Sequence, residues 1–544
     1  MVDGESALPS GPQDRGDLST LSELVINYAQ ERPGEPAYIE PDRTTSWAEY
    51  DRCGDAIARV LMTAGVPRGG RAAVLLPDTV EFHAALLGAE RAGVVAVGIG
   101  ARAGDAEITH LLRQTGATAL ITLGTHRGRD MAAAVATFAD YVATLHIHVV
   151  LNRDGDHVAR DVRQNRPLAD TASAAPQVTG RATAVDELWA LNSTSGTTGL
   201  PKCVQQTQQR WKLLSRLAVA NGELHSQDVF LGAVPGPFGF GLWTAHVCPT
   251  MLGVPTVLLG TFDIAVLARM IETHRVTVLA AVSTQFRMLL NSPAAERTDL
   301  SSLRVLFTGG EPIGTAAAAA FEERTGAVAL NFFGSNETGA ISATTIHDPA
   351  AQRLATAGRV LPGTDVRLYD DTGNDITATG GPGQPGAVGP LLCNGYYADD
   401  AANAELYHDD GHMLMGDLVT IDDAGYVRLV GRKSDIIIRG GKNLSAVEME
   451  SAIHTHPAVQ LAAVVSIPDD EFGERACAVV STRDDAELSL HALTEHMLDN
   501  GMSKELLPEY LLHMAEFPIS AGGKVAKDQV REIAVTRLAN NTNS

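Results

Sequence analysis

Basic residues are scarce in this chain. Its 544 residues include 42 Lys and Arg against 65 Asp and Glu, which gives a formal net charge of −23. Nucleic-acid binding needs a basic footprint that neutralises phosphates, so this balance argues against a nucleic-acid partner. Long apolar runs are missing too, because the most apolar stretch, 82–99, is interrupted by Glu90 and Arg91, which excludes a membrane span. An anionic small molecule held by a few local Lys and Arg side chains is compatible with both absences.

Cysteine is also sparse, and several short motifs that mark metal sites or catalytic serines are absent from the sequence. No C-x-x-C pair, H-E-x-x-H or G-x-S-x-G string occurs, which argues against structural zinc, zincin proteases and a serine nucleophile elbow. Residues 1–20 are acidic, show no charged-then-apolar signal pattern, and are expected to form a tail. An odd, dispersed set of cysteines is typical of reduced thiols in a cytoplasmic protein. The five cysteines are Cys53, Cys203, Cys248, Cys393 and Cys477.

The pattern of apolar runs predicts an α/β fold. Short apolar runs alternate with amphipathic stretches between about residues 70 and 335, as in parallel sheets with helices on their faces. Runs 71–76, 94–99 and 276–282 are predicted strands, and ligands of such folds collect beyond the carboxyl ends of strands. We predict an N-terminal domain of doubly wound sheets over 21–431, with a β-rich subdomain from about 358 to 431, and a small α+β domain over 437–544.

The segment 193–202 carries the strongest chemical signal. It follows a predicted buried strand, 187–192, and consists of hydroxyl residues, glycines and a final lysine, Lys202. Glycines allow close approach of the backbone, free amides and hydroxyls bind phosphate oxygens, and Lys202 adds a compact positive charge. A Walker loop is excluded because Pro201 replaces the second glycine and Cys203 follows the lysine. We predict a phosphate-binding loop made by Thr194, Ser195, Gly196, Thr197, Thr198, Gly199 and Lys202.

Further segments supply groups that suit a nucleotide. Phe333 offers a flat face for a base, and Glu337 is a hard oxygen ligand suited to Mg²⁺. Asp417 can accept both hydroxyl protons of a ribose, and Arg432 presents a planar fork to ribose or phosphate. Lys524, on a glycine-rich loop, can reach a carboxylate and a phosphate as they react.

In this order, these segments resemble the motifs of the adenylate-forming superfamily, which includes acyl-CoA synthetases, peptide-synthetase adenylation domains and luciferases. The resemblance covers residues 20–535 and is closest to the acid–CoA ligase branch. It implies catalytic roles for Lys524, Lys202 and Glu337, with Glu337 holding Mg²⁺. It also implies a hinge at 432–436, with Ser434 as the hinge residue, which makes the C-terminal domain mobile. It also implies a nucleotide site completed by Gly310, Glu311, Phe333, Gly334, Ser335, Asn336, Asp417 and Arg432, an acyl pocket at Pro237, Phe238, Gly239, Gly309 and Gly334, and a CoA channel at Gly440 and Gly441.

Two of these positions depart from the superfamily's pattern. Asn336 stands where a threonine is usual, which puts a hydroxyl contact to phosphate in doubt. Ser434 stands where relatives carry Asp or Lys. The chain could instead be a nucleotide-binding sensor that has lost its catalytic activity. An active enzyme is favoured because the residues that match the superfamily's pattern include Lys202, Glu337, Asp417, Arg432 and Lys524.

The resemblance implies a two-step reaction. A carboxylic acid and MgATP would give acyl-AMP and pyrophosphate, and CoA would then displace AMP to give an acyl-CoA thioester. Three glycines within 234–241 and the tail 456–523 favour a bulky hydrophobic acid, alicyclic, polycyclic or fatty. CoA is the simplest acceptor because no carrier domain is fused. A stand-alone acyl- or aryl-AMP ligase that loads a carrier protein and a luciferase-like oxygenase remain alternatives, and the oligomeric state is open, a homodimer included.

Overall fold

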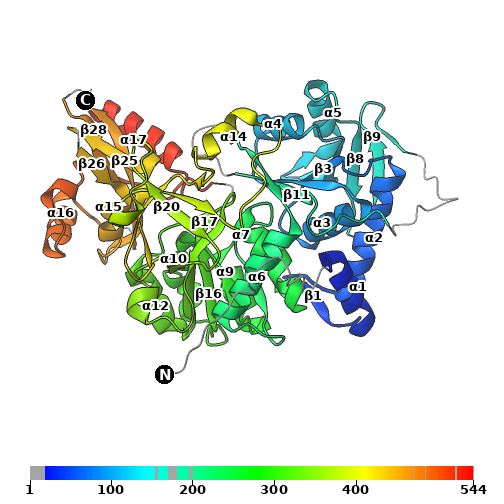
Figure 1. The fold of residues 1–544 in the computed structure, drawn as a ribbon, viewed down its shortest axis with the longest axis horizontal. Helices are drawn as coiled ribbons and strands as arrows, with labels where there is room; N and C mark the ends of the chain where they lie inside the picture. The colour runs from blue at the N-terminus through cyan, green and yellow to red at the C-terminus, as the bar shows by residue number, and fades with distance from the viewer. Residues whose placement is uncertain are drawn as a thin grey trace.

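The computed structural model describes residues 19–153, 157–168, 180–194, 200–440, 442–469, 471–483, 486–520 and 524–542. Two large sheets with helices on their faces form an N-terminal body, and a smaller domain with its own sheet lies against one side of it (Figure 1). The α/β class and the division into a large and a small part, both predicted from the sequence, are confirmed. Within the described ranges, no helix is long and apolar enough to cross a membrane.

The first large sheet has the strand order β10-β9-β8-β5-β3-β4-β11-β12. Ala72 and Val74 of β3 belong to one hydrophobic core with helices α2 and α3, whereas Ala73 and Leu75 belong to another with α4 and α5. Both faces are therefore buried, which is why the inner strands are mostly apolar. The bounds are β3 (Arg71–Leu75), β4 (Val95–Ile99), β5 (Ala119–Leu123), β8 (Ile147–Leu151), β9 (Val158–Asp161), β10 (Arg166–Pro167), β11 (Ala190–Ser193), β12 (Cys203–Gln206), α2 (Trp47–Thr63), α3 (Val80–Ala92), α4 (Asp105–Thr115) and α5 (Met131–Tyr141).

The second large sheet has the order β19-β18-β17-β16-β15-β13-β14-β1-β2. Val305 and Phe307 of β16 share the core that also lies under the first sheet, and Leu306 faces a second core with α9, α10 and α12. The shared core joins the two sheets into one body. The bounds are β1 (Pro36–Glu40), β2 (Arg43–Ser46), β13 (Phe230–Gly232), β14 (Thr256–Val257), β15 (Val278–Ala280), β16 (Val305–Gly309), β17 (Val328–Ser335), β18 (Gly339–Ala343), β19 (Arg359–Val360), α1 (Leu21–Glu31), α6 (Gln208–Gly222), α9 (Ile264–His274), α10 (Ser283–Leu290) and α12 (Thr315–Thr325).

Two details differ from the sequence-based expectation. The predicted strand 276–282 shrinks to β15, because Val282 already adopts the N-cap position of α10. The sheets are parallel only in their centres, since β12, β18 and β19 pair antiparallel with their neighbours. Such antiparallel edge strands are common on otherwise parallel sheets.

Small sheets follow the second large sheet and lead to the C-terminal domain. A three-stranded sheet, β20-β21-β22, and the pair β23-β24 precede a short 3₁₀ helix, η3 (Lys433–Asp435). The predicted hinge residue Ser434 lies in this 3₁₀ helix. The strand bounds are β20 (Asp365–Tyr369), β21 (Gln384–Val388), β22 (Met413–Leu414), β23 (Asp417–Ile421) and β24 (Val427–Arg432), with α14 (Asp400–Leu406) between β21 and β22.

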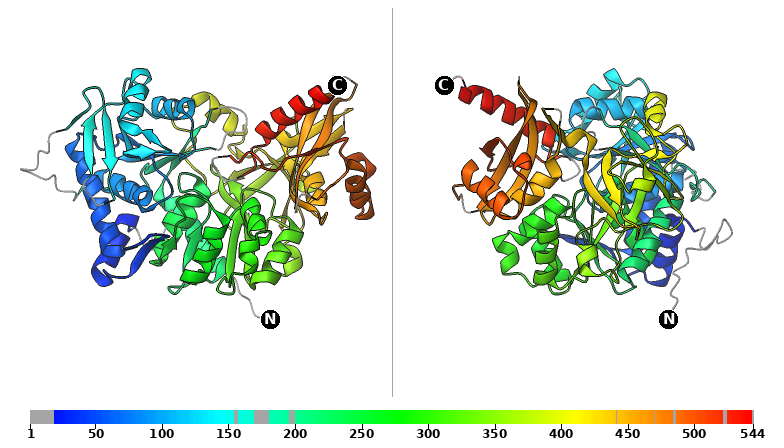
Figure 2. Two further views of the ribbon diagram at one scale, coloured as in Figure 1. Left: turned by 180° about the vertical axis from the view of Figure 1, so that it is seen from behind. Right: turned by 60° about the vertical axis from the view of Figure 1, so that its left-hand side comes forward.

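The C-terminal domain has a sheet of order β26-β25-β28-β27, with β29 paired to β28. The two views of Figure 2 place this domain, orange to red, beside the second sheet, in green, and away from the blue and cyan first sheet. The bounds are β25 (Ile436–Arg439), β26 (Lys442–Ser445), α15 (Ala446–Ile453), β27 (Val459–Asp469), β28 (Gly473–Thr482), α16 (Leu490–Asp499), β29 (Tyr510–His513) and α17 (Lys527–Thr542).

Candidate active site between the two domains

A cleft of about 1520 Å³ separates the second sheet from the C-terminal domain. It opens at the carboxyl ends of β16 and β17, where a ligand of an α/β fold is expected. Many of the residues predicted from the sequence line it, from both domains and from the link between them: Thr194, Phe238, Gly310, Glu311, Phe333, Gly334, Asp417, Arg432 and Lys524. Lys202, Gly309, Ser335, Asn336 and Glu337 lie close by in sequence but do not line this cleft, and Ser195, Gly196, Thr197, Thr198 and Gly199 lie outside the described residues.

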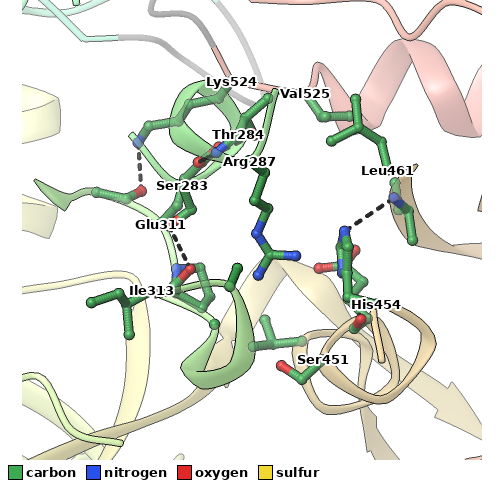
Figure 3. Close-up of a pocket in the computed structure, with 18 of the residues that line it drawn as sticks. Ser283, Thr284, Arg287, Glu311, Ile313, Ser451, His454, Leu461, Lys524 and Val525 are labelled. Carbon is green, nitrogen blue, oxygen red and sulfur yellow. Dashed lines mark hydrogen bonds between the residues drawn. The ribbon is translucent and has the colours of Figure 1, made fainter. Parts of the chain in front are cut away.

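Lys524 reaches across the cleft from the C-terminal domain. Its Nζ donates a hydrogen bond to the Gly310 carbonyl oxygen, 2.6 Å away (Figure 3). Gly310 has φ +73°, and a Cβ there would lie 2.9 Å from that Nζ, so a glycine is needed at this approach. Loss of hydration, together with the nearby Arg432 guanidinium, lowers the pKa of Lys524 to about 8. A lysine ammonium that has lost part of its hydration in a cleft favours the binding of an anionic ligand.

Asp417 and Arg432 line the cleft together with Phe333. They are cross-strand partners in the β23–β24 pair, and Arg432 Nε donates to Asp417 Oδ1 at 3.1 Å. The neighbouring Asp417 and Asp435 carboxylates raise the pKa of Arg432 despite the loss of hydration around it, so it remains a cation. Glu311 is engaged differently, because its carboxylate accepts hydrogen bonds from Thr284 N at 3.0 Å and from the Thr284 hydroxyl at 3.2 Å. This fixes the turn after β16 to the start of α10.

Glu337 follows β17 and is oriented by an aromatic residue that the sequence did not single out. The Tyr396 hydroxyl donates to Glu337 Oε1 at 2.7 Å. Lys202 Nζ lies 4.9 Å from the centre of the same Tyr396 ring, so the lysine, the ring and the carboxylate form one unit. Burial and the Glu337 carboxylate raise the pKa of Tyr396, which therefore stays protonated and donates. In the sequence, Tyr396 is only an aromatic residue after Gly395. It lies 59 positions from Glu337, so the contact could not be predicted.

Asn336, the residue that departs from the superfamily's threonine, is paired with a second amide. Asn192 Nδ2 donates to Asn336 Oδ1 at 2.9 Å, and Asn336 Nδ2 donates back to Asn192 Oδ1 at 3.0 Å. Gln206 Nε2 donates to Asn192 Oδ1 at 2.6 Å. The amide network therefore ties β11 and β12, on either side of the predicted phosphate loop, to the turn that carries Glu337.

Arg210 holds the same turn from α6. Its guanidinium donates to the carbonyl oxygens of Asn336, Glu337 and Leu391 and to the Gln206 side chain. Burial lowers the pKa of Arg210 to about 10, and no carboxylate is among these partners. Neither Arg210 nor Asn192 was found from the sequence, because each acts through backbone carbonyls or amides rather than through a motif.

Comparison with known proteins now identifies the family. A family model described as AMP-binding enzyme matches residues 26–397, and one described as AMP-binding enzyme C-terminal domain matches residues 448–524. The chain belongs to the AMP-binding enzymes. It is therefore a ligase of the adenylate-forming superfamily, which joins an acid to AMP at the expense of ATP.

Three relatives show the range within this family. A Mycobacterium tuberculosis propanoyl:CoA ligase, whose acyl group carries a methyl-dioxo-octahydroindenyl ring system, is 29% identical over 95% of this chain and 99% of its own. A salicyl-AMP ligase / salicyl-S-ArCP synthetase of the same species is 30% identical over 94% of this chain and 88% of its own. The crystal structure of ATP-bound MatB from Rhodopseudomonas palustris superposes with a TM-score of 0.79 at 25% identity, covering 94% of this chain and 99% of that one.

In this AMP-binding enzyme, the predicted acyl segment packs between the nucleotide side and an aromatic core. A Cβ on Gly239 would lie 2.4 Å from Asn336 Oδ1 and 3.2 Å from the Trp211 ring, so this position accepts only glycine. Pro237 lies against Gly98 of β4, and a Cβ on Gly309 would clash with the Phe332 carbonyl oxygen at 2.4 Å. The segment 237–240 thus lies beside Asn336 at Gly239 and beside Gly309 at Phe240.

Behind this segment lies an aromatic cluster that the sequence did not predict as part of the site. Trp243, on the π-helical segment η1 (Leu242–Val247), stacks on Phe307 with ring centres 5.5 Å apart and meets Phe332 edge-on at 4.9 Å. Phe240 lies edge-on to Trp243 at 5.6 Å and faces Gly309. The core behind the acyl segment is therefore aromatic, although these four rings do not themselves line the cleft.

Gly440 and Gly441 are the residues that the resemblance predicts beside a CoA channel. Gly440 has φ +58°, and a Cβ there would meet the Phe472 ring at 3.3 Å. Gly440 does not line the cleft, and Gly441 lies outside the described residues. Both glycines belong to the C-terminal domain, so only a movement of that domain could bring them to the site where Lys524 now lies.

The donor chemistry near Glu337 fits Mg²⁺ bound together with ATP. Among the described residues, no group of three or more His, Cys, Asp or Glu side chains could hold a metal ion by itself. Mg²⁺ accepts one or two carboxylates when substrate phosphates supply further oxygens. Glu337 is such a carboxylate, and the Tyr396 hydroxyl on Oε1 fixes its orientation.

Proposed function

We propose that this enzyme is an ATP-dependent acid–CoA ligase that forms an acyl-AMP and then an acyl-CoA thioester. The observation that carries the first step is the position of Lys524, whose Nζ lies 2.6 Å from the Gly310 carbonyl oxygen beside Arg432 and Asp417. A mobile lysine in this place meets the atoms that become charged when a carboxylate attacks the α-phosphorus of ATP. The CoA-forming relative, which covers nearly the whole of both chains, supports the choice of acceptor.

In the first step the substrate carboxylate oxygen attacks the α-phosphorus, the bond to the bridging oxygen breaks, and pyrophosphate leaves. The Lys524 ammonium would stabilise the negative charge that builds on the α-phosphate and carboxylate oxygens. Asp417 would accept the ribose hydroxyls, Arg432 would hold Asp417 and the nucleotide, and Phe333 would stack on the adenine. Mg²⁺ held by Glu337 would supply neutralisation of the phosphate charge.

In the second step the CoA sulfur attacks the acyl carbon and AMP leaves. We propose that the C-terminal domain turns about Ser434 between the steps, which withdraws Lys524 and brings Gly440 and Gly441 to the site. Glycines suit a narrow channel for pantetheine because they have no Cβ. The reversible, non-covalent contacts of Lys524 in the cleft are compatible with such a withdrawal.

The acid is proposed to be bulky and hydrophobic, alicyclic, polycyclic or fatty. The aromatic core of Phe240, Trp243, Phe307 and Phe332 directly behind Gly239 and Gly309 supports an apolar acyl group. The fused-ring acyl group in the name of one relative supports the same class. A cytoplasmic location is part of the proposal, supported by five free cysteines that form no disulfide.

A second candidate is an acyl- or aryl-AMP ligase that loads a carrier protein. The relative that is 30% identical is named for salicyl-AMP formation and transfer to ArCP, so the family contains both acceptors. The two candidates share the first step and differ only in the thiol that takes the acyl group.

A mass-spectrometric screen tests both candidates. The protein and MgATP are incubated with fatty, aryl, alicyclic and polycyclic acids, with and without CoA. We expect AMP and an acyl-CoA mass with a hydrophobic acid. Acyl-AMP that persists in the presence of CoA, but is consumed by a phosphopantetheinyl carrier protein, would overturn the CoA proposal in favour of the second candidate. Lys524→Ala serves as the control, since it should abolish pyrophosphate release while still converting added acyl-AMP and CoA to the thioester.

A further inference from the structure

Lys527 makes contacts that the mechanism above does not use. It is the first residue of α17, three residues after Lys524, and its Nζ lies 3.0 Å from Asp435 Oδ2 and 2.8 Å from Glu450 Oε1. A helix N-terminus carries partial positive charge, so a lysine there is electrostatically unfavourable unless anions compensate it. The carboxylates of Asp435 and Glu450, both at hydrogen-bond distance, compensate the charge of Lys527 at this helix N-terminus.

The two carboxylates belong to different parts of the molecule. Asp435 ends the 3₁₀ helix η3, at the link between the domains, and its side chain is 21% exposed. Glu450 lies on α15 and also accepts a hydrogen bond from Val464 N of β27 at 2.8 Å, so it is anchored in the C-terminal core. Lys527 thus joins the interdomain link to the body of the C-terminal domain.

The same residue limits where Lys524 can go. Three residues span at most about 10 Å even when fully extended, so an anchored Lys527 restricts the reach of Lys524. The loop is held on its other side by backbone bonds from Ser520 N to the Lys524 carbonyl oxygen at 2.7 Å and from Ala526 N to the Pro518 carbonyl oxygen at 2.8 Å. The loop that carries Lys524 and the residue next to the proposed hinge are therefore parts of one cross-linked unit.

We propose that Lys527 is a positioning residue that acts through Asp435 and Glu450. The inference rests on the proposed function, because it assigns Lys527 to the adenylation step. Because Asp435 is bound to Lys527, it moves with the C-terminal domain as one rigid body. The rotation of one domain relative to the other is then confined to the residues before Asp435. Closure of the domain then brings Lys524 to the Gly310 carbonyl in one defined position. Without this cross-link, bending spreads beyond residue 435 and Lys524 arrives displaced.

The first test separates the two half-reactions in the full-length protein. Lys527→Met removes the charge at similar volume, Lys527→Arg keeps a cation that can bridge two carboxylates, and Arg537→Gln is the matched control. Arg537 is an exposed residue of the same helix that does not line the cleft, and its Nη1 donates to the His513 carbonyl oxygen at 2.9 Å. Pyrophosphate release is measured with MgATP and the best acid of the screen, and thioester formation is measured from synthetic acyl-AMP and CoA.

For Lys527→Met we expect pyrophosphate release to fall by about 10- to 100-fold, as for a displacement of about 1 Å, with the KM for ATP changed less than about twofold. Thioester formation should stay within about twofold of wild type, because Lys524 takes no part in it. Lys527→Arg should recover most of the rate, and Arg537→Gln should change neither half-reaction. Equal losses in both half-reactions, or no loss in the first, would overturn the proposal.

The second test needs no acid and therefore holds even if every acid in the screen fails. Hydrogen exchange of residues 433–439 and 524–530 is measured for wild type, Lys527→Met, Asp435→Asn and Arg537→Gln. We expect Lys527→Met and Asp435→Asn to raise exchange in both segments together, and Arg537→Gln to leave 433–439 unchanged. Unchanged exchange at 433–439 in Lys527→Met would overturn the proposed link. If wild type forms acyl-AMP but rejects CoA, the proposed acceptor fails while pyrophosphate release still tests Lys527.

Discussion

The pKa of Lys524 predicts a specific alkaline limit to the adenylation step. With the pKa lowered to about 8, the ammonium needed next to the reacting phosphate is lost as pH rises through that value. The kcat/KM for ATP, which reports groups of the free enzyme, should be flat below about pH 7, half-maximal near pH 8 and about tenfold lower at pH 9. An unperturbed lysine would keep the rate constant to beyond about pH 10.

The groups that face Lys524 define the controls. Arg432 lowers the pKa of Lys524, whereas Glu311 and Asp417 raise it. Arg432→Gln should therefore move the midpoint above pH 8, even if its plateau rate is lower because a nucleotide contact is lost. Lys524→Arg should remove the alkaline limb altogether, since a guanidinium stays charged above about pH 12. Bound ATP adds negative charge, so the limb seen in kcat should lie at higher pH than the limb in kcat/KM.

Pyrophosphate release from MgATP and the acid, followed between pH 6.5 and about pH 10 at constant ionic strength, measures this profile. A wild-type kcat/KM that is flat to pH 10 would refute the assignment of a perturbed ammonium to the site. So would an alkaline limb of the same midpoint in Lys524→Arg, because some other group would then be titrating.

Three further predictions concern the walls of the site. Glu337→Gln should raise the Mg²⁺ concentration needed for half-maximal pyrophosphate release, because a carboxylate ligand is lost; an unchanged requirement would remove the proposed metal role. Asn336→Thr should lower the free energy of unfolding by about 1–3 kcal/mol in urea titrations, because it leaves the buried Asn192 Nδ2 without its acceptor; a stabilised variant would contradict the reciprocal amide pair. Phe307→Ala should cost about 3–5 kcal/mol, because the ring is 0% exposed and packed against Trp243. A loss below 1 kcal/mol, at an unchanged urea dependence, would show that the aromatic cluster is not tightly packed.

The central strands could be predicted because their signal is local. In β4, and in β3 after its first residue Arg71, every residue is apolar or small and both faces are covered, so an uninterrupted apolar run marks each strand. The ends of the strands are harder to predict. After β15, for example, Val282 could extend the strand or cap a helix, and the start of α10 decides between the two. The nucleotide-side residues Gly310, Phe333 and Asp417 were found because each lies in a short string with a fixed order along the chain.

The sequence by itself determined the α/β class, the family's motifs and the groups that can meet ATP, because residue types and local spacing carry that information. Tertiary structure alone decided what each group touches. Tyr396 orients Glu337 and Asn192 engages Asn336 only because strands far apart in the chain end beside one another. Lys527 likewise meets Asp435 across 92 positions of sequence, and only the folded C-terminal domain brings the start of α17 to the interdomain link. These contacts depend on the packing of whole elements, which no short segment encodes.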